Sequence, residues 1–92
     1  MFTILLPLDQ VGTTRRDFMD AMMQEGIGTG ISYEAIHLTT LFRRKGFHEG
    51  QFPVSERIAR ETVTLPLFPE MRSSDVDRVC ESIRRVLRRK AA

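Results

Sequence analysis

Residues 14–33 read TRRDFMDAMMQEGIGTGISY, and the order of features within this stretch decides the fold class. Thr14 followed by Asp17 is typical of a helix start, because a threonine hydroxyl accepts from an early helical N–H and the acid can bond back. Apolar residues recur at helical spacing as far as Gly26, a residue type that commonly closes a helix in the left-handed conformation. We therefore predict a helix that ends in glycines and is followed by a short strand over 29–33.

The glycines at positions 26, 28 and 30 invite comparison with loops that bind phosphate groups. A dinucleotide-binding loop follows a strand and opens a helix, and a Walker loop ends in Gly-Lys-Ser/Thr. Here the order is helix, glycines, strand, and no such ending is present. The pattern therefore favours a helix terminus and a turn over a phosphate-binding loop.

The remaining pattern extends this interpretation along the whole chain. We predict strands over 2–6 and 63–69, one helical turn within 39–45, a helix from Pro53 to Arg60, and a final helix that begins at Ser73 or Ser74. The final helix carries an apolar stripe at i, i+3, i+4, i+7 spacing, formed by Val76, Val79, Cys80, Ile83, Val86 and Leu87. The predicted fold class is α+β: a small antiparallel sheet of about three strands with helices packed on one face.

Length, cysteine content and hydropathy limit the setting. Ninety-two residues predict a single small domain over 1–92, with a small core. Cys80 is the only cysteine, which excludes an internal disulfide and favours a reducing, cytoplasmic setting. Its place in the apolar stripe predicts a buried, structural thiol. The apolar run over 2–8 is too short to span a membrane, so no membrane association is predicted.

Charge and ligand spacing exclude two further classes of site. The net charge is +2, and Arg84, Arg85, Arg88, Arg89 and Lys90 crowd the last nine residues. This tail has no aromatic residue for base stacking, and cations suit a helix C-terminus, so a solvated helix end is favoured over nucleic-acid binding. His37, His48 and Cys80 lie far apart without paired ligand spacing, so no metal site is predicted.

An ordered series of motifs carries a family resemblance over about four fifths of the chain, from Arg16 onward. The series comprises Glu25-Gly26-Ile27, Ser32-Tyr33-Glu34, His37, Gly46-Phe47, the segment 52–59, the segment 65–69 and the segment 75–79. In this series the chain resembles the C-terminal small domain of the DegT/DnrJ/StrS family, whose members are pyridoxal phosphate (PLP)-dependent aminotransferases acting on nucleotide-linked keto sugars. The resemblance implies the small-domain fold of fold-type I aminotransferases.

The resemblance also implies a missing part. In such enzymes a preceding large domain binds PLP and supplies the Schiff-base lysine, and active sites look shared between two subunits of a homodimer. This chain has only Lys45 and Lys90, and neither stands in a setting like that of the family's cofactor lysine. We therefore expect the large PLP-binding domain to be absent, this chain to hold no cofactor of its own, and the chain alone not to transaminate.

Two residues are predicted to bind substrate, on the basis of the resemblance alone. Ser32-Tyr33-Glu34 matches the family's His-Tyr-Pro segment, which resembles an active-site rim facing the sugar nucleotide, and His37 follows it. Tyr33 would supply a phenol hydrogen bond, and His37 an imidazole contact to sugar or phosphate. Ser32 and Glu34 depart from the family's histidine and proline. The alternative is structural, with Tyr33 a half-buried strand aromatic and His37 a loop histidine bonded to backbone.

A second function class remains open from the sequence. The chain could be a stand-alone binding or regulatory module that uses its basic C-terminal helix or an apolar face left bare. The sequence thus predicts either the C-terminal fragment or remnant of an aminotransferase for polysaccharide or lipopolysaccharide sugars, or such a module.

Overall fold

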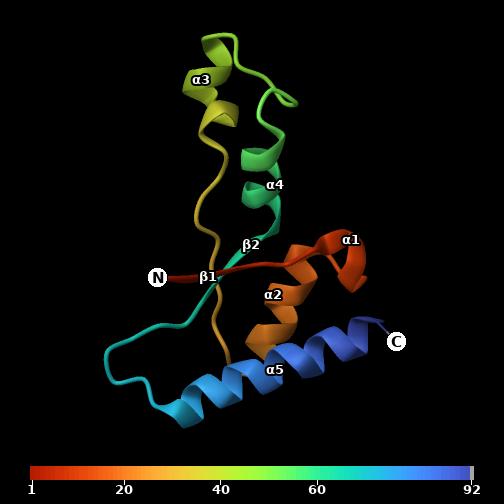
Figure 1. Cartoon of the computed structure of the whole chain (residues 1–92), viewed down its shortest axis with the longest axis vertical. Helices are drawn as coiled ribbons and strands as arrows, with labels where there is room; N and C mark the ends of the chain where they lie inside the picture. Colours follow the sequence, from red (N-terminus) through yellow and green to blue (C-terminus); the bar gives the residue numbers. More distant parts are fainter. Residues whose placement is uncertain (92) are drawn as a thin grey trace.

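The computed structural model describes residues 1–91 and contains two strands and six helical segments. The strands are β1 (Phe2–Leu5) and β2 (Thr62–Leu65); the helices are α1 (Leu8–Val11), α2 (Arg15–Gln24), the 3-10 turn η1 (Ile36–Leu38), α3 (Thr40–Arg44), α4 (Pro53–Glu61) and α5 (Ser73–Ala91). In the view of Figure 1, α2 and α5 lie below the sheet, whereas α3 and α4 project to the opposite end. The predicted α+β class is confirmed.

The sheet pairs β1 and β2 antiparallel, with Phe2 opposite Leu65 and Ile4 opposite Val63. The expected third strand over 29–33 is reduced to one bridge, in which the backbones of Gly30 and Thr64 exchange hydrogen bonds of 3.0 and 2.8 Å. The next outward-facing carbonyl of β2, that of Thr62, accepts from Arg15 Nη1 instead. The sheet therefore has two strands, and the Arg15 side chain bonds the carbonyl that a longer third strand would use.

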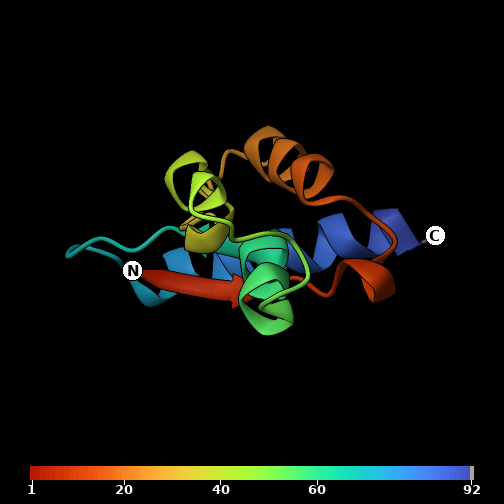
Figure 2. The ribbon, with the colours of Figure 1, turned by 90° about the horizontal axis from the view of Figure 1, so that it is seen from above.

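The core lies between one face of the sheet and the helices α2 and α5. Its buried members are Leu6, Phe18, Met22, Ile27, Val63, Leu65 and Val86, and partly buried residues of α1 and α5 pack around them. Seen from above, β1 and α5 run along the same direction, and the two termini lie at opposite ends of this layer (Figure 2). This arrangement agrees with the expected packing of helices on one face of the sheet.

Both predicted ends of α2 are present. The Thr14 hydroxyl accepts from the backbone N–H of Asp17 at 3.1 Å, which caps the first turn. At the other end Gly26 has φ +82°, and the N–H groups of Gly26 and Ile27 donate to the carbonyls of Met23 and Met22. This is a Schellman closure, in which the left-handed residue lets the chain turn back and bury Ile27 beside Met22.

α5 confirms the final helix but corrects one residue on it. Val79, Ile83 and Leu87 pack against the core, and Val86 is buried within it. Cys80, predicted to be a buried thiol, is exposed. The first turns of α5 extend past the sheet, where Val76 and Cys80 line a shallow apolar groove of about 140 Å³ with Phe2 and Leu67. The apolar stripe of α5 is therefore longer than the core against which the helix packs.

The projecting end of the molecule, formed by η1, α3 and α4, carries apolar side chains on its outside. The predicted turn within 39–45 and the helix beginning at Pro53 are both present. In α4, however, Val54 and Ile58 are exposed, whereas the two glutamates Glu56 and Glu61 are buried. Two exposed apolar side chains and two buried glutamates depart from the pattern of a solvated surface helix, so this end presents a face suited to a partner surface.

Candidate functional site

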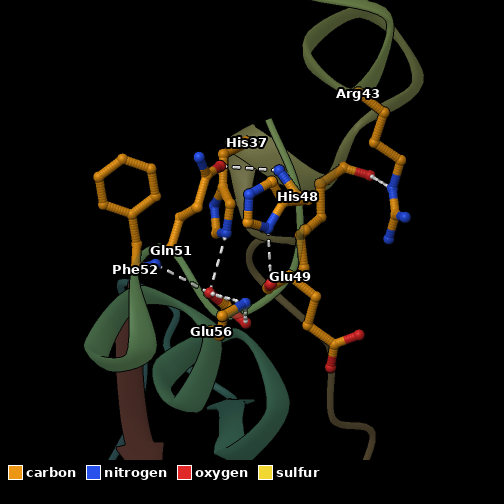
Figure 3. Close-up of polar contacts among 9 residues, drawn as sticks. His37, Arg43, His48, Glu49, Gln51, Phe52 and Glu56 are labelled. Carbon is orange, nitrogen blue, oxygen red and sulfur yellow. Dashed lines mark hydrogen bonds and ion pairs between the residues drawn. The ribbon is translucent and has the colours of Figure 1, made fainter. Parts of the chain in front are cut away.

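His37 and Glu56 form a buried pair at the base of the projecting end. His37 is 7% exposed, and its Nε2 lies 3.1 Å from Oε2 of Glu56 (Figure 3). The pair joins η1 to the first turn of α4, two segments 19 residues apart. The Phe52 ring packs edge-on against the imidazole, with ring centroids 4.9 Å apart. His37 is therefore held in place on two sides.

The Glu56 carboxylate also collects backbone donors. The N–H of Gly50 donates to both oxygens, at 2.8 and 3.1 Å, and the N–H of Phe52 donates to Oε2 at 3.0 Å. These bonds lower the pKa of Glu56 below its ordinary value, chiefly through Gly50 and then through Phe52 and His37, against the opposing effect of burial. Glu56 is thus an ionised anchor that ties the loop over 45–52 to α4 and to η1.

The loop itself is ordered by short polar contacts that Figure 3 displays. The Gln51 side-chain oxygen accepts from the backbone N–H of His48 at 2.7 Å, and His48 Nδ1 lies 3.0 Å from the Glu49 carbonyl. Arg43 Nε donates to the Leu38 carbonyl at 2.7 Å and links α3 to η1. His48 therefore serves the local loop, apart from the His37 pair.

The two predicted substrate residues lie in different environments. Tyr33 is 74% exposed, so it is neither part of a strand nor half-buried as the structural alternative expected. His37 is buried, and its Nε2 is bonded to a carboxylate and not to backbone. The chain neighbours Ile31 and Glu34 line an open cavity of about 330 Å³, together with Arg15, Arg43, Arg60 and Glu56 among others. The exposed phenol of Tyr33 therefore belongs to a segment that borders this cavity.

The basic tail has a structural partner. Arg85 and Arg89 form ion pairs with the Glu25 carboxylate at 3.1 and 3.2 Å, and Arg78 donates to the Glu25 carbonyl. These contacts fasten the end of α2 to α5. Part of the C-terminal positive charge is therefore used inside the fold, in keeping with the interpretation of the tail as a helix end.

Sequence reasoning missed the role of Glu56 and of Arg15. A signal for the role of Glu56 was present in the sequence. Glu56 stands in the first turn of a helix that begins with proline, and an acid at such a position often accepts hydrogen bonds from early N–H groups. Its pairing with His37 had no local signal. Arg15 donates to the Ala59 and Thr62 carbonyls at the end of α4, a contact across 44 and 47 residues.

Comparison with known proteins shows which family the chain belongs to. Residues 1–84 match the sequence model of the DegT/DnrJ/EryC1/StrS aminotransferase family. The chain belongs to this family. Uncharacterized protein MJ1066 of Methanocaldococcus jannaschii is 25% identical over 88 residues, which are 95% of this chain and 23% of that protein. The predicted family resemblance is confirmed.

The fold matches a solved structure as well. The structure is similar to sugar aminotransferase Spr1654 of Streptococcus pneumoniae in its PMP form, with a TM-score of 0.79 and 18% identity over 97% of this chain and 22% of that one. The chain thus spans about a quarter of the length of these proteins. No helix within residues 1–91 has the length and apolar character needed to cross a membrane.

The described part of the chain does not place a lysine where it could bind PLP covalently. Such a cofactor needs a lysine whose amine meets its aldehyde inside a site. The Lys45 ammonium lies 5.9 Å from the centroid of the Phe42 ring, on an exposed residue just after α3. The side chain of Lys90 lies outside the described part of the chain. No step of cofactor chemistry is therefore assigned to the residues that the structure describes.

Proposed function

We propose that these 92 residues act as the C-terminal small domain of a PLP-dependent aminotransferase for nucleotide-linked keto sugars, within polysaccharide or lipopolysaccharide sugar biosynthesis in the cytoplasm. The proposal rests on how much of each protein is matched. Nearly the whole of this chain matches each of the two relatives, but the match covers only about a quarter of each relative's length. A large domain, supplied by another part of the enzyme, would bind PLP and provide the lysine. Alone, the chain would not transaminate.

The exposed apolar face of α4 supports a role beside another domain. Val54 is 72% exposed and Ile58 46% exposed, and Ile36 and Leu41 add apolar surface on η1 and α3. Burying such surface against a large domain would release about 25 cal/mol for each Å² removed from water. We expect this face to meet the large domain or the partner subunit of a homodimer.

Within this enzyme, Tyr33 and His37 would form the rim that faces the sugar nucleotide. Tyr33 has an exposed hydroxyl that can donate or accept a hydrogen bond, whereas His37 is fixed by Glu56 and Phe52 beneath it. Tyr33 would contact the substrate directly. The predicted contact of His37 with the substrate would need a movement that exposes its imidazole, because the side chain is buried and its Nε2 is bonded to Glu56.

The proposal is tested in a chimera in which this chain replaces the matching segment of the Streptococcus pneumoniae protein. We expect the chimera to form an amino sugar from a nucleotide-linked keto sugar. Tyr33→Phe should raise KM about 3- to 10-fold, the value of one hydrogen bond, and Leu67→Ala, an exposed residue of the apolar groove beside α5, should not. Equal kinetics for Tyr33→Phe and the unsubstituted chimera would contradict the role of Tyr33.

A further inference from the structure

A cationic depression lies between the start of α2 and the end of α4. Its volume is about 490 Å³, and its lining consists of Arg15, Arg16, Met19, Asp20, Ile31 and Arg60. Arg15, Ile31 and Arg60 also line the cavity of about 330 Å³ that borders the Tyr33 segment. The two hollows therefore adjoin along these three residues.

The charges of the two linings differ. The cavity beside Tyr33 has three arginines and three glutamates in its lining, so its charges balance. The depression has three arginines against the single carboxylate of Asp20. Of these two hollows, the depression is the one with an excess of positive charge, and an anion would be drawn there. A hollow on α5 has the same excess, with three arginines against Glu81, but Arg85 in its lining is already paired with Glu25.

Local structure accounts for one of the three arginines but not for the other two. Arg15 Nη1 donates to the Ala59 and Thr62 carbonyls, which fixes the guanidinium and leaves its other donors available. Arg16 and Arg60 are exposed and form no ion pair with any residue of the described range 1–91. Arg16 also stands at the positive end of α2, where a cation is disfavoured by the helix dipole.

We propose that Arg15, Arg16 and Arg60 form a phosphoanion site that takes a diphosphate. Guanidinium groups match phosphate oxygens through paired N–H donors, and one of these groups is already held in position. Ile31 lines both hollows and is two residues from Tyr33, so a diphosphate bound here would lie beside the segment proposed to face the sugar. The identity of the diphosphate as part of a nucleotide-linked sugar rests on the proposed function.

The test uses the 92-residue chain and inorganic pyrophosphate at constant ionic strength. Backbone amide shifts followed by NMR should saturate and should be largest around Arg15, Met19 and Ile31. Arg16→Gln and Arg60→Gln should each weaken binding about tenfold, the usual size of a charge-assisted hydrogen bond. Arg44→Gln is the matched control, because it removes the same charge from an exposed position on α3 that lines neither hollow. Circular dichroism confirms that each variant is folded.

Several outcomes would overturn the site. These are shifts that do not saturate, shifts centred elsewhere, or equal weakening by Arg44→Gln and Arg60→Gln. Inorganic phosphate should bind about tenfold more weakly than pyrophosphate, and equal affinity would contradict the assignment to a diphosphate. Because the titration contains no cofactor, amino donor or sugar, it is independent of the proposed function. Pyrophosphate binding with an inactive chimera would keep the site and reject the aminotransferase role, whereas an active chimera without binding would do the reverse.

Discussion

The imidazole of His37 and the carboxylate of Glu56 meet at 3.1 Å between Nε2 and Oε2, and both side chains are buried. This contact crosses from η1 to α4 and is the centre of a small network that includes the N–H groups of Gly50 and Phe52. One carboxylate thereby sets the position of a histidine, a loop and a helix start. Glu56 therefore links the three segments that form the projecting end of the molecule.

We expect Glu56→Gln to destabilise the chain and to do so in a pH-dependent way. The pKa of Glu56 is lowered in the folded state, so its ionised form adds stability above the unfolded pKa of about 4.3, and this stability is lost as pH falls through the folded pKa. The gap between the unfolding free energies of the native chain and the variant should therefore shrink from pH 7 to pH 3. Urea unfolding at several pH values measures it. A gap that is constant over this range would contradict the role of the ionised carboxylate.

Gly26→Ala should cost about 1–3 kcal/mol of unfolding free energy, because a residue with a Cβ must adopt a positive φ at this position. The added Cβ would also stand 2.8 Å from Nη2 of Arg78. Gly28→Ala is the matched control. A Cβ added at Gly28 would meet no atom within 4 Å beyond its chain neighbours, and φ there is not positive, so a change below about 0.5 kcal/mol is expected. Equal losses in urea unfolding would show that the Schellman closure is not the cause.

Val86→Ala should lower the unfolding free energy by about 2 kcal/mol, because it empties space at a fully buried position of α5. Val76→Ala removes the same atoms from the exposed first turns of that helix and should cost less than about 0.5 kcal/mol. Thermal or urea unfolding of the two variants provides the comparison. A larger loss of unfolding free energy for Val76→Ala than for Val86→Ala would contradict the position of the core along α5.

Cys80 should react with a thiol reagent in the folded chain, because it is exposed on α5. The rate of labelling in native buffer should approach the rate in urea. If the thiol reacts only after the chain unfolds, Cys80 is buried, as the apolar stripe of α5 predicts, and the exposed position is wrong.

The sequence predicts those features whose causes are local. Thr14 and Gly26 mark the ends of α2 because a cap and a left-handed closure each depend on a few neighbouring residues. The third strand is reduced to a bridge at Gly30, and the Thr62 carbonyl next to it bonds Arg15, which lies 47 residues away in the chain. Local pattern carries no information about such a competitor.

The candidate site divides in the same way. Tyr33 and His37 follow from a resemblance to a family, and their roles toward a substrate remain predictions. The anchoring of His37 by Glu56 depends on a contact across 19 residues, and Cys80 is exposed because the sheet ends before the stripe does. Periodicity shows which face of a helix is apolar, but not how far its neighbour extends.

The most direct test of the account is an assay, in the presence of PLP, of amino-group transfer from an amino donor to a nucleotide-linked keto sugar. The 92-residue chain is assayed alone and together with the separately produced part of the Streptococcus pneumoniae protein that lies outside the segment matched by this chain. The account predicts no aldimine absorbance and no product from the chain alone, and product from the mixture. Turnover by the chain alone would contradict it.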